Sequence, residues 1–262
     1  MIHLKTSEEI AIMKEGGNKL GTILEDLLAY SQPGVVLMDI EKRACDLIEK
    51  AGAAASFKIV PGYKWATCLN VNEVVVHGIP TQYILKDGDI LTIDIGLIYK
   101  GFHTDTAGTK IIGDRVQSLV EKQKFLDVGK KALQKGIEQA KIGNRIGNIS
   151  KVVQETIEGA GYSIVKSLVG HGVGRDLHEE PQIPNYLRGA IENTLPLKEG
   201  MTIAIEPIYA AGQGEIVYKN TDGWTLATRD RSLTSVFEHS LAITANGPIV
   251  LTRSSKTPQG QF

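Results

Sequence analysis

Four acidic residues lie in segments that otherwise have the pattern of apolar β-strands. They are Asp94 in LTIDIGLIY, Asp105 in FHTDTAGTK, Glu206 in MTIAIEPIY and Glu238 in SVFEHSLAIT. A carboxylate that is buried without a cationic partner is strongly disfavoured, so we expect a cation among them. His171, in SLVGHGVGR, adds an imidazole of the kind that transition metals bind. One imidazole and four hard oxygen ligands predict a metal centre with two ions.

A single acid in a strand has a simpler explanation. Some of the 30 acidic residues fall in strands by chance, and such a side chain is more often an edge-strand charge or an ion-pair partner than a metal ligand. Two pairs of acids at related positions, together with His171, are poorly explained in that way.

The composition limits the class of protein. A chain of 262 residues is at the upper end of what one hydrophobic core supports. Its 29 basic and 30 acidic residues form no block of like charge, which argues against nucleic acid or an anionic membrane surface as a partner. Cys45 and Cys68 form no zinc-binding pattern and are expected to be reduced thiols. No leader-like segment or long apolar run is present, so we expect a soluble, cytoplasmic protein.

Helical periodicity predicts two helices in each half of the chain. Thr6 and Glu9 have the spacing of a capping box at the start of the first helix. From Ser56 onward the residues favour a strand, with a turn at Pro61 and Gly62. The predicted helices cover about residues 6–32, 39–51, 116–140 and 148–158.

The two halves share a common layout. Gly34 and Gly143, which follow helices, are 109 residues apart, and so are Gly52 and Gly161. The same offset, with one small insertion, brings the strand of Asp94 onto the strand of Glu206. Each half then ends in a hairpin with two acids. We therefore predict one catalytic domain over residues 1–262, built from pseudo-symmetric halves at about 1–110 and 111–262.

The alternation of residues along these strands indicates how they are layered. Asp94 shares one strand face with Thr92 and Gly96, whereas the aliphatic Ile93 and Ile95 lie on the other. Small neighbours leave room for a ligand, and the aliphatic face is suited to pack under helices. The predicted class is α+β, with a curved antiparallel sheet, helices on its outer face and a pseudo-twofold axis that brings the acids together in its concavity.

Several stretches of the chain resemble the methionine aminopeptidases of the pita-bread fold. The resemblance spans nearly the whole chain and rests on NEVVVHGIP, IDIG, DTAGT, GHGVGRDLHEEP, IAIEP and NTDGWTLATRDRSLTSVFEH. Only 27 residues separate His178 from Glu206, which leaves no room for the long helical insertion of type II enzymes. The chain is therefore similar to the short, bacterial-type form of type I.

The resemblance implies a set of metal ligands. Asp105 and Glu238 would bridge two divalent ions, Asp94 would hold one of them, and His171 with Glu206 would hold the other. The ions would be Co, Mn, Fe or Zn, and spacing does not choose among them. The family also has a monovalent cation site, which aligns here with Asn72, Val74 and Thr234.

The resemblance also implies a reaction, the hydrolytic removal of the N-terminal methionine from peptides and nascent proteins. A hydroxide that bridges the two metals would be the nucleophile. Glu206 would shuttle the proton to the leaving amine, and His178 would donate a hydrogen bond to the developing oxyanion. His77 would contact the backbone nitrogen of the second residue, where a small side chain is preferred.

The methionine side chain would enter an apolar slot. The family pattern nominates Tyr63, Cys68, Leu177 and Trp224 as its walls, although each is individually more typical of plain core. Leu177 departs from the aromatic residue of the best-matching bacterial forms, which leaves the outline of the slot open there. A norleucine side chain should be tolerated, because one missing methylene in such a slot changes the discrimination between two substrates by only about 1–3 kcal/mol.

The remaining expectations come from the family's role. They are a monomer, with transient contact to the ribosome and no recognition of nucleic-acid sequence or membrane. Two alternatives stay open. One is a proline-specific aminopeptidase or dipeptidase, which uses the same fold and ligands but usually has a further N-terminal domain. The other is a binding protein that kept the fold and lost catalysis, which should lack some of the ligands.

Overall fold

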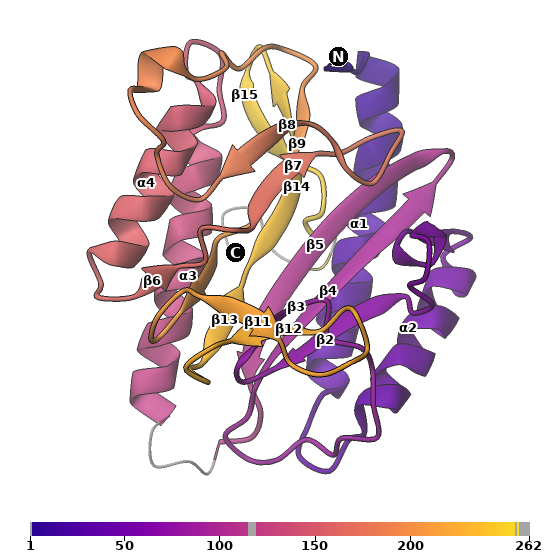
Figure 1. The fold of residues 1–262 in the computed structure, drawn as a ribbon. Helices are drawn as coiled ribbons and strands as arrows, with labels where there is room; N and C mark the ends of the chain where they lie inside the picture. Colours follow the sequence, from indigo (N-terminus) through magenta and orange to yellow (C-terminus); the bar gives the residue numbers. More distant parts are fainter. Residues whose placement is uncertain (1, 115–118, 255, 257–262) are drawn as a thin grey trace.

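The structure is a computed structural model that describes residues 2–114, 119–254 and 256. Figure 1 shows its helices behind a layer of strands, with α1 and α2 on one side and α3 and α4 on the other. The helices are α1 (Ser7–Tyr30), α2 (Leu37–Lys50), α3 (Leu119–Gln139) and α4 (Ile146–Glu158), with the short 3-10 helices η1 (Phe57–Ile59) and η2 (Ile191–Asn193). None of the described helices is long and apolar enough to cross a membrane.

Two ten-residue strands form the central hairpin of the first half, and the other described strands have seven residues or fewer. In the first half they are β1 (Ala54–Ala55), β2 (Thr67–Val71), β3 (Val74–Val76), β4 (Ile90–Tyr99) and β5 (Phe102–Ile111). In the second half they are β6 (Ser163–Ile164), β7 (Val169–Gly172), β8 (Glu179–Pro184), β9 (Thr202–Ile205), β10 (Ile208–Ala210), β11 (Ile216–Tyr218), β12 (Leu226–Thr228), β13 (Thr234–Val236), β14 (Glu238–Thr244) and β15 (Gly247–Val250).

One antiparallel sheet joins the two halves. Its strand order is β1-β4-β5-β14-β9-β7-β8, with β2 beside β4 and β15 beside β14. The hairpin β4–β5 of the first half therefore lies directly against the β14–β9 pair of the second half. Two three-stranded sheets, β13-β10-β6 and β11-β12-β3, complete the strand layer. The predicted α+β class, with helices on the outer face of an antiparallel sheet, is confirmed (Figure 1).

The helices pack where the alternation of the strands predicts. The capping box at the start of α1 is present, since Glu9 N donates to Thr6 Oγ1 at 3.3 Å and Thr6 N donates to Glu9 Oε2 at 3.0 Å. Leu20 and Leu27 of α1 are fully buried in one cluster with Ile93 and Ile95 of β4. Each such side chain contributes about 1.5–3 kcal/mol when it leaves water. A separate cluster forms under α3 and α4.

Matching registers support the proposed division into halves. Gly34 and Gly143 both have left-handed backbones, with φ of 91° and 92°, which glycine adopts without steric cost. Strand β1 pairs with β4 through Ala54 and Ile98, and β6 pairs with β10 through Ser163 and Ala210. The offset is 109 residues for the first members of these pairs and 112 for the second. The small insertion therefore lies between the short strand and the strand that carries the acid.

Two local predictions need correction. The strand expected from Ser56 onward is wrong, because residues 57–59 form the 3-10 helix η1 and the next strand begins at Thr67. Gly96 explains this turn: a Cβ there would lie 2.8 Å from Ser56 Cβ, so the absence of a side chain lets the segment pack on the sheet. Helix α4 begins at 146, two residues early, and the predicted start of α3 at 116 lies outside the described residues.

Candidate active site

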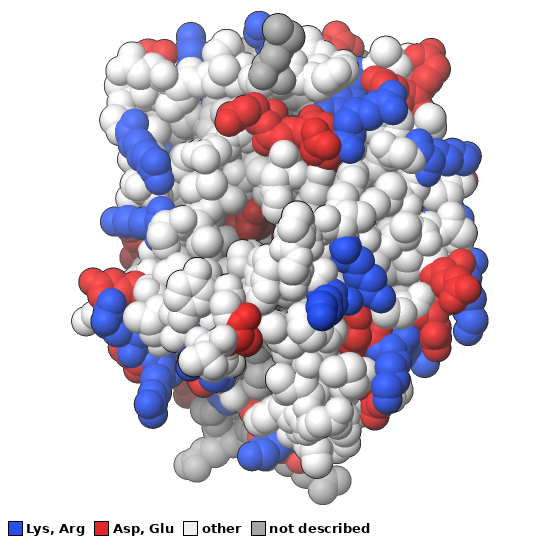
Figure 2. All heavy atoms as spheres, turned by 45° about the vertical axis from the view of Figure 1, so that its right-hand side comes forward, with Lys and Arg blue, Asp and Glu red and all other residues white. Residues whose placement is uncertain are grey.

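The five predicted metal ligands line a single pocket with a volume of about 180 Å³. They come from different elements, because Asp94 lies on β4, Asp105 on β5, His171 on β7 and Glu238 on β14, and Glu206 directly follows β9. Figure 2 shows Asp and Glu atoms at the bottom of a hollow that is mostly surrounded by uncharged residues. The fold thus brings together residues that are as far as 144 positions apart in sequence.

Strand register explains why these side chains meet. Ala107 on β5 pairs with Asp94 on one side and with Glu238 on the other. His171 pairs with another alanine, Ala204. Because the paired residue in each case carries only a methyl group, space remains between the polar side chains. Ligand atoms of Asp105, His171 and Glu238 all lie within 4.8 Å of one another, close enough to share an ion.

Two carboxylate oxygens of this cluster lack a partner in the described part of the chain, whereas Asp105 Oδ1 accepts a hydrogen bond from Thr106 N at 3.0 Å. Asp94 Oδ1 and Glu238 Oε1 are buried and have no hydrogen-bond partner among the described residues. Burial, together with the nearby Asp105, raises the pKa of Asp94, Glu206 and Glu238 well above their usual range. Burial also raises the pKa of Asp105 to about 7. Closely spaced carboxylates without counter-charges are costly, and a bound cation removes that cost.

His171 is oriented as a ligand. Its Nδ1 lies 2.8 Å from the backbone oxygen of Gly172, so this nitrogen donates the ring proton. The lone pair is then on Nε2, which lies 3.7 Å from Glu206 Oε1. Burial lowers the pKa of His171 to about 4, so the ring is neutral near pH 7. A neutral imidazole with its second nitrogen fixed by a backbone carbonyl is a common arrangement at metal sites.

These observations fit a divalent metal centre. Two orphaned carboxylate oxygens, one imidazole lone pair and further carboxylates face the same space. Oxygen and nitrogen donors of this kind suit Mn, Fe, Co or Zn. The thiol of Cys68 also lies on the pocket wall. Burial raises the pKa of this thiol, so it stays protonated and is not available as a thiolate ligand.

The two further histidines lie on the pocket wall. The ring of His178 meets that of His171 edge-on, with ring centroids 4.5 Å apart. His77 follows β3 with a left-handed backbone, φ 57°, and its ring lies edge-on to Trp224 at 6.4 Å. Burial lowers the pKa of both His77 and His178. Each ring is therefore neutral and has one N–H to donate to a bound molecule.

The rest of the pocket is an apolar wall. All four nominated wall residues line it: Tyr63, Cys68, Leu177 and Trp224. The rings of Tyr63 and Trp224 meet edge-on, with centroids 5.1 Å apart. The Tyr63 hydroxyl donates to Thr67 O at 2.9 Å, so its polar end is satisfied within the protein. Aromatic rings and aliphatic groups of this kind bind a flexible thioether well.

Sequence reasoning missed three wall residues, Phe57, Val60 and Val76. Phe57 and Val60 lie in the segment that was wrongly predicted as strand, where they pack with Tyr63 and Leu177, and Val76 ends β3. The apolar pair on either side of Lys58 and Ile59, just before the Pro61 turn, was the only available signal.

The predicted monovalent cation site consists of atoms that lie together. Thr234 Oγ1 is 3.0 Å from the carbonyl oxygen of Asn72 and 2.7 Å from that of Val74. Three oxygens from two distant segments thus converge, which is the kind of group a monovalent cation uses. Cation binding here stays a prediction.

Comparison with known proteins agrees with this geometry. The chain matches the model of metallopeptidase family M24 over residues 11–245. Methionine aminopeptidase 1 of Bacillus subtilis is 42% identical over 253 residues, which cover 97% of this chain and 100% of the relative. The crystal structure of methionine aminopeptidase from Thermotoga maritima superposes with a TM-score of 0.92 at 40% identity, covering 97% of this chain and 100% of that chain.

A more distant likeness concerns the fold alone. Prolidase from Pyrococcus furiosus gives a TM-score of 0.73 at 23% identity, and the match covers 97% of this chain but 66% of the prolidase. Between His178 and Glu206 this chain has β8, η2 and β9, and the three-residue η2 is the only helical element there. The similarity to type I enzymes predicts this absence of a long helical insertion. The chain therefore belongs to metallopeptidase family M24 and, within it, to the methionine aminopeptidases of the pita-bread fold.

Proposed function

We propose that this protein removes the N-terminal methionine from peptides and nascent proteins by metal-dependent hydrolysis. One observation carries the proposal: two buried carboxylate oxygens without a partner among the described residues, and an imidazole lone pair, share a pocket with a cluster of apolar side chains. Membership of a metallopeptidase family implies that divalent metal is used. The printed names of the relatives supply the substrate class.

Each ligand has a proposed role. Asp105 and Glu238 would bridge two divalent ions, Asp94 would hold the first, and His171 with Glu206 would hold the second. When bound, such a pair of ions would lower the pKa of a water molecule and so supply hydroxide as the nucleophile. The two-ion count and the metal itself, Co, Mn, Fe or Zn, are part of this proposal.

The chain's own side chains would handle the substrate and the protons. Glu206 would accept the proton of the attacking water and return it to the leaving amine. His178, neutral through burial, would donate a hydrogen bond to the oxyanion, and His77 would contact the backbone nitrogen of the second residue. The rings of His77 and Trp224 lie edge-on on the pocket wall, with centroids 6.4 Å apart, and next to these two rings we expect a small second residue to be preferred.

The apolar wall would hold the methionine side chain. Leu177 stands where the family pattern leads us to expect an aromatic side chain, so this part of the slot would be wider. The Cys68 thiol, protonated and buried, would be an uncharged wall. Norleucine peptides should therefore be cleaved within about 1–3 kcal/mol of methionine peptides in transition-state stabilisation.

Peptide hydrolysis with defined products tests the function. The purified protein, supplied with Mn or Co, should release methionine from Met-Ala-Ser and leave Lys-Ala and Ala-Pro intact. A series of Met-Xaa-Ser peptides should lose activity as Xaa grows from glycine to leucine. Cleavage of Ala-Pro alone would support the proline-specific alternative, and metal binding without any cleavage would support a binding protein.

Nascent chains as substrates would place the protein in the cytoplasm, in transient contact with ribosomes. Co-sedimentation of the protein with translating ribosomes, compared with empty ribosomes, would test that part of the proposal. Gel filtration with light scattering would test the expected monomer.

A further inference from the structure

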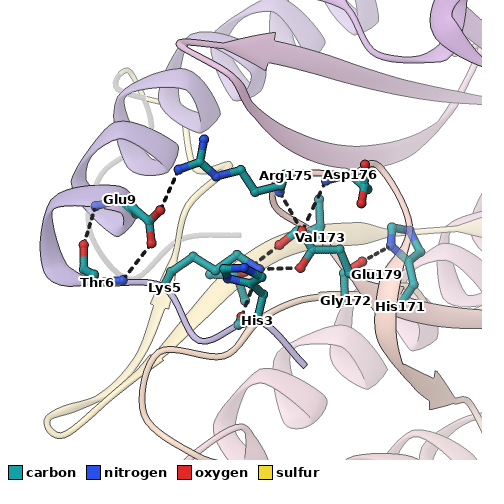
Figure 3. A network of polar contacts seen from close by, with 11 residues as sticks. His3, Lys5, Thr6, Glu9, His171, Gly172, Val173, Arg175, Asp176 and Glu179 are labelled. Atoms are coloured by element: carbon teal, nitrogen blue, oxygen red, sulfur yellow. Dashed lines mark hydrogen bonds and ion pairs between the residues drawn. The ribbon is translucent and has the colours of Figure 1, made fainter. Parts of the chain in front are cut away.

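The loop between β7 and β8 is held by residues far from it in sequence. This loop, residues 173–178, brings Leu177 and His178 to the pocket. Figure 3 shows that side chains of the N-terminal segment, from His3 to Glu9, reach toward the other end of the same loop. The loop therefore connects the pocket wall with the beginning of the chain.

Glu179, the residue after His178, closes the loop with its carboxylate. Its Oε1 accepts hydrogen bonds from the backbone N–H groups of Arg175, at 2.6 Å, and Asp176, at 3.2 Å. Its Oε2 forms an ion pair with Lys5 (Figure 3). One side chain thus satisfies two loop amides and a lysine from another segment.

Lys5 is unusually buried for a lysine. Its side chain is 1% exposed and that of Glu179 is 11% exposed, so neither charge is well solvated. The Lys5 ammonium also donates to His3 O at 3.1 Å, and Lys5 N donates to Gly200 O at 2.7 Å. Removing one partner of such a pair leaves an uncompensated buried charge, which is strongly destabilising locally.

The loop itself makes room for this ion pair. A Cβ on Gly174 would lie 2.3 Å from Lys5 Cε and 2.8 Å from Glu179 Oε1. The carbonyl of Gly174 in turn accepts a hydrogen bond from His103 N on β5 at 2.7 Å. Glycine at this position therefore lets the lysine stem pass directly against the loop backbone.

A second contact between the same two segments is weaker. Arg175 donates to Glu9 Oε1 at 2.8 Å, and its guanidinium lies 4.2 Å from the ring centroid of Phe102. The Arg175 side chain is 55% exposed, and exposed pairs contribute little. The buried pair of Lys5 and Glu179 is therefore the main connection.

We propose that Lys5 and Glu179 are positioning residues that fix His178 and Leu177 relative to the acid cluster. The inference rests on the proposed function, because it assigns His178 a task that needs accurate placement. His178 directly precedes Glu179, so movement of the Glu179 carboxylate shifts the imidazole. A misplacement of about 1 Å at a reacting group can reduce the rate about 100-fold.

Kinetics in two backgrounds test the proposal. Lys5→Met and Glu179→Gln, each measured with Met-Ala-Ser at saturating metal, should lower kcat about 10- to 100-fold, as substitutions in supporting residues commonly do, with a smaller change in KM. In a His178→Ala background the same substitutions should cause little further loss. An equal loss in both backgrounds, or normal kcat in both single variants, would overturn the proposal.

Hydrogen exchange provides a readout that needs neither metal nor activity. In the metal-free wild-type chain the amides of Arg175 and Asp176 should be protected, and Glu179→Gln or Lys5→Met should increase their exchange while α3 stays protected. If Lys5→Met does not fold, Glu179→Gln, which keeps the side-chain volume, decides the question. Unchanged exchange in a folded Glu179→Gln variant would contradict the positioning role.

A matched control separates positioning from general loss of stability. Lys110 is also a partly buried lysine, and its ammonium donates to Leu28 O and Ser31 O at 2.9 Å each, on the other side of the sheet. Lys110→Met should lower the melting temperature and leave kcat unchanged. Failure of the wild type to release methionine would count against the proposed function, whereas the exchange experiment would still test the loop.

Discussion

Two groups of buried carboxylates differ in how the protein treats them. Glu41 on α2 is 5% exposed, and its two oxygens accept hydrogen bonds from Ala66 N at 2.7 Å, Thr67 N at 3.0 Å and Thr67 Oγ1 at 2.7 Å. In the pocket, Asp94 Oδ1 and Glu238 Oε1 are buried without such partners. Among the described residues, the fold supplies donors to Glu41 but not to these two pocket oxygens.

This difference indicates where the missing partner comes from. An unpaired buried carboxylate costs free energy, so a fold keeps several of them together only when something outside the chain compensates. Glu41 also has a role in the site, because it holds the backbone just before Cys68 and so places one wall of the pocket. Glu41, whose oxygens accept hydrogen bonds, helps to position the pocket wall. The pocket oxygens without donors among the described residues are available to bind cations.

The largest expected effect comes from the acid cluster of the pocket. Asp105→Asn removes a charge proposed to be shared by both ions, so activity on Met-Ala-Ser should fall to background and tight metal binding should be lost. Calorimetric titration with Mn or Co would measure the affinity. Unchanged affinity for two ions would break the comparison, because Asp105 would then resemble a structural acid.

His178→Ala should have the next largest effect and should act on turnover alone. Loss of a donor to the oxyanion typically costs about 2.7–4 kcal/mol in the barrier, so kcat should fall about 100- to 1,000-fold. Metal affinity should stay at the wild-type value, since no acid is changed. A variant with normal kcat would remove His178 from the mechanism.

Glu41→Gln tests how much the hydrogen bonds accepted by the Glu41 carboxylate contribute to stability. The amide places an NH₂ group against backbone or hydroxyl donors, and one unsatisfied buried donor costs about 1–3 kcal/mol. The free energy of unfolding in urea should fall by that amount, with metal affinity unchanged. Glu49→Gln, at an exposed position of the same helix, is the matched control and should be neutral. Equal stability of both variants would show that the hydrogen bonds of Glu41 contribute nothing.

A further expected effect is a pH-dependent difference in stability between two metal-free proteins. Burial raises the pKa of Asp105 to about 7, so its ionisation destabilises the folded state as pH rises from about 4 to 7. Chelated Asp105→Asn should therefore be more stable than chelated wild type at pH 8, by more than about 1 kcal/mol. The gap should close as pH falls toward 4. A gap that widens at low pH would contradict the raised pKa.

Much of the fold was predictable because its signals are local. The capping box of Thr6 and Glu9, the helical periodicity of α1 and the period-two alternation around Asp94 depend on neighbours within a few residues. The repeat offset was equally accessible, because glycines such as Gly34 and Gly143 commonly end helices, where they adopt left-handed backbones without steric cost. These features placed the helices, the layers and the acid-bearing strands.

Other features had no local signal. Residues 57–59 form η1 instead of a strand, packed on the sheet where Gly96, 40 positions from Ser56, leaves space for Ser56 and Phe57. No local pattern marks Lys5 as a buried residue, and it is buried because the fold places it against Glu179. Both outcomes depend on contacts between distant segments, which periodicity and turn residues do not encode.

The amino-acid sequence by itself determined which chemical groups are available, namely four strand-borne acids and a glycine-flanked histidine, and it determined the helices and strands that carry them. Only the tertiary structure decided which of the buried acids would be satisfied. The reason is physical: hydrogen-bond donors for a buried carboxylate come from backbone amides that are distant in sequence, as Ala66 and Thr67 are for Glu41. Where the described part of the chain brings no such donor, as at Asp94 Oδ1 and Glu238 Oε1, the fold leaves a site for cations.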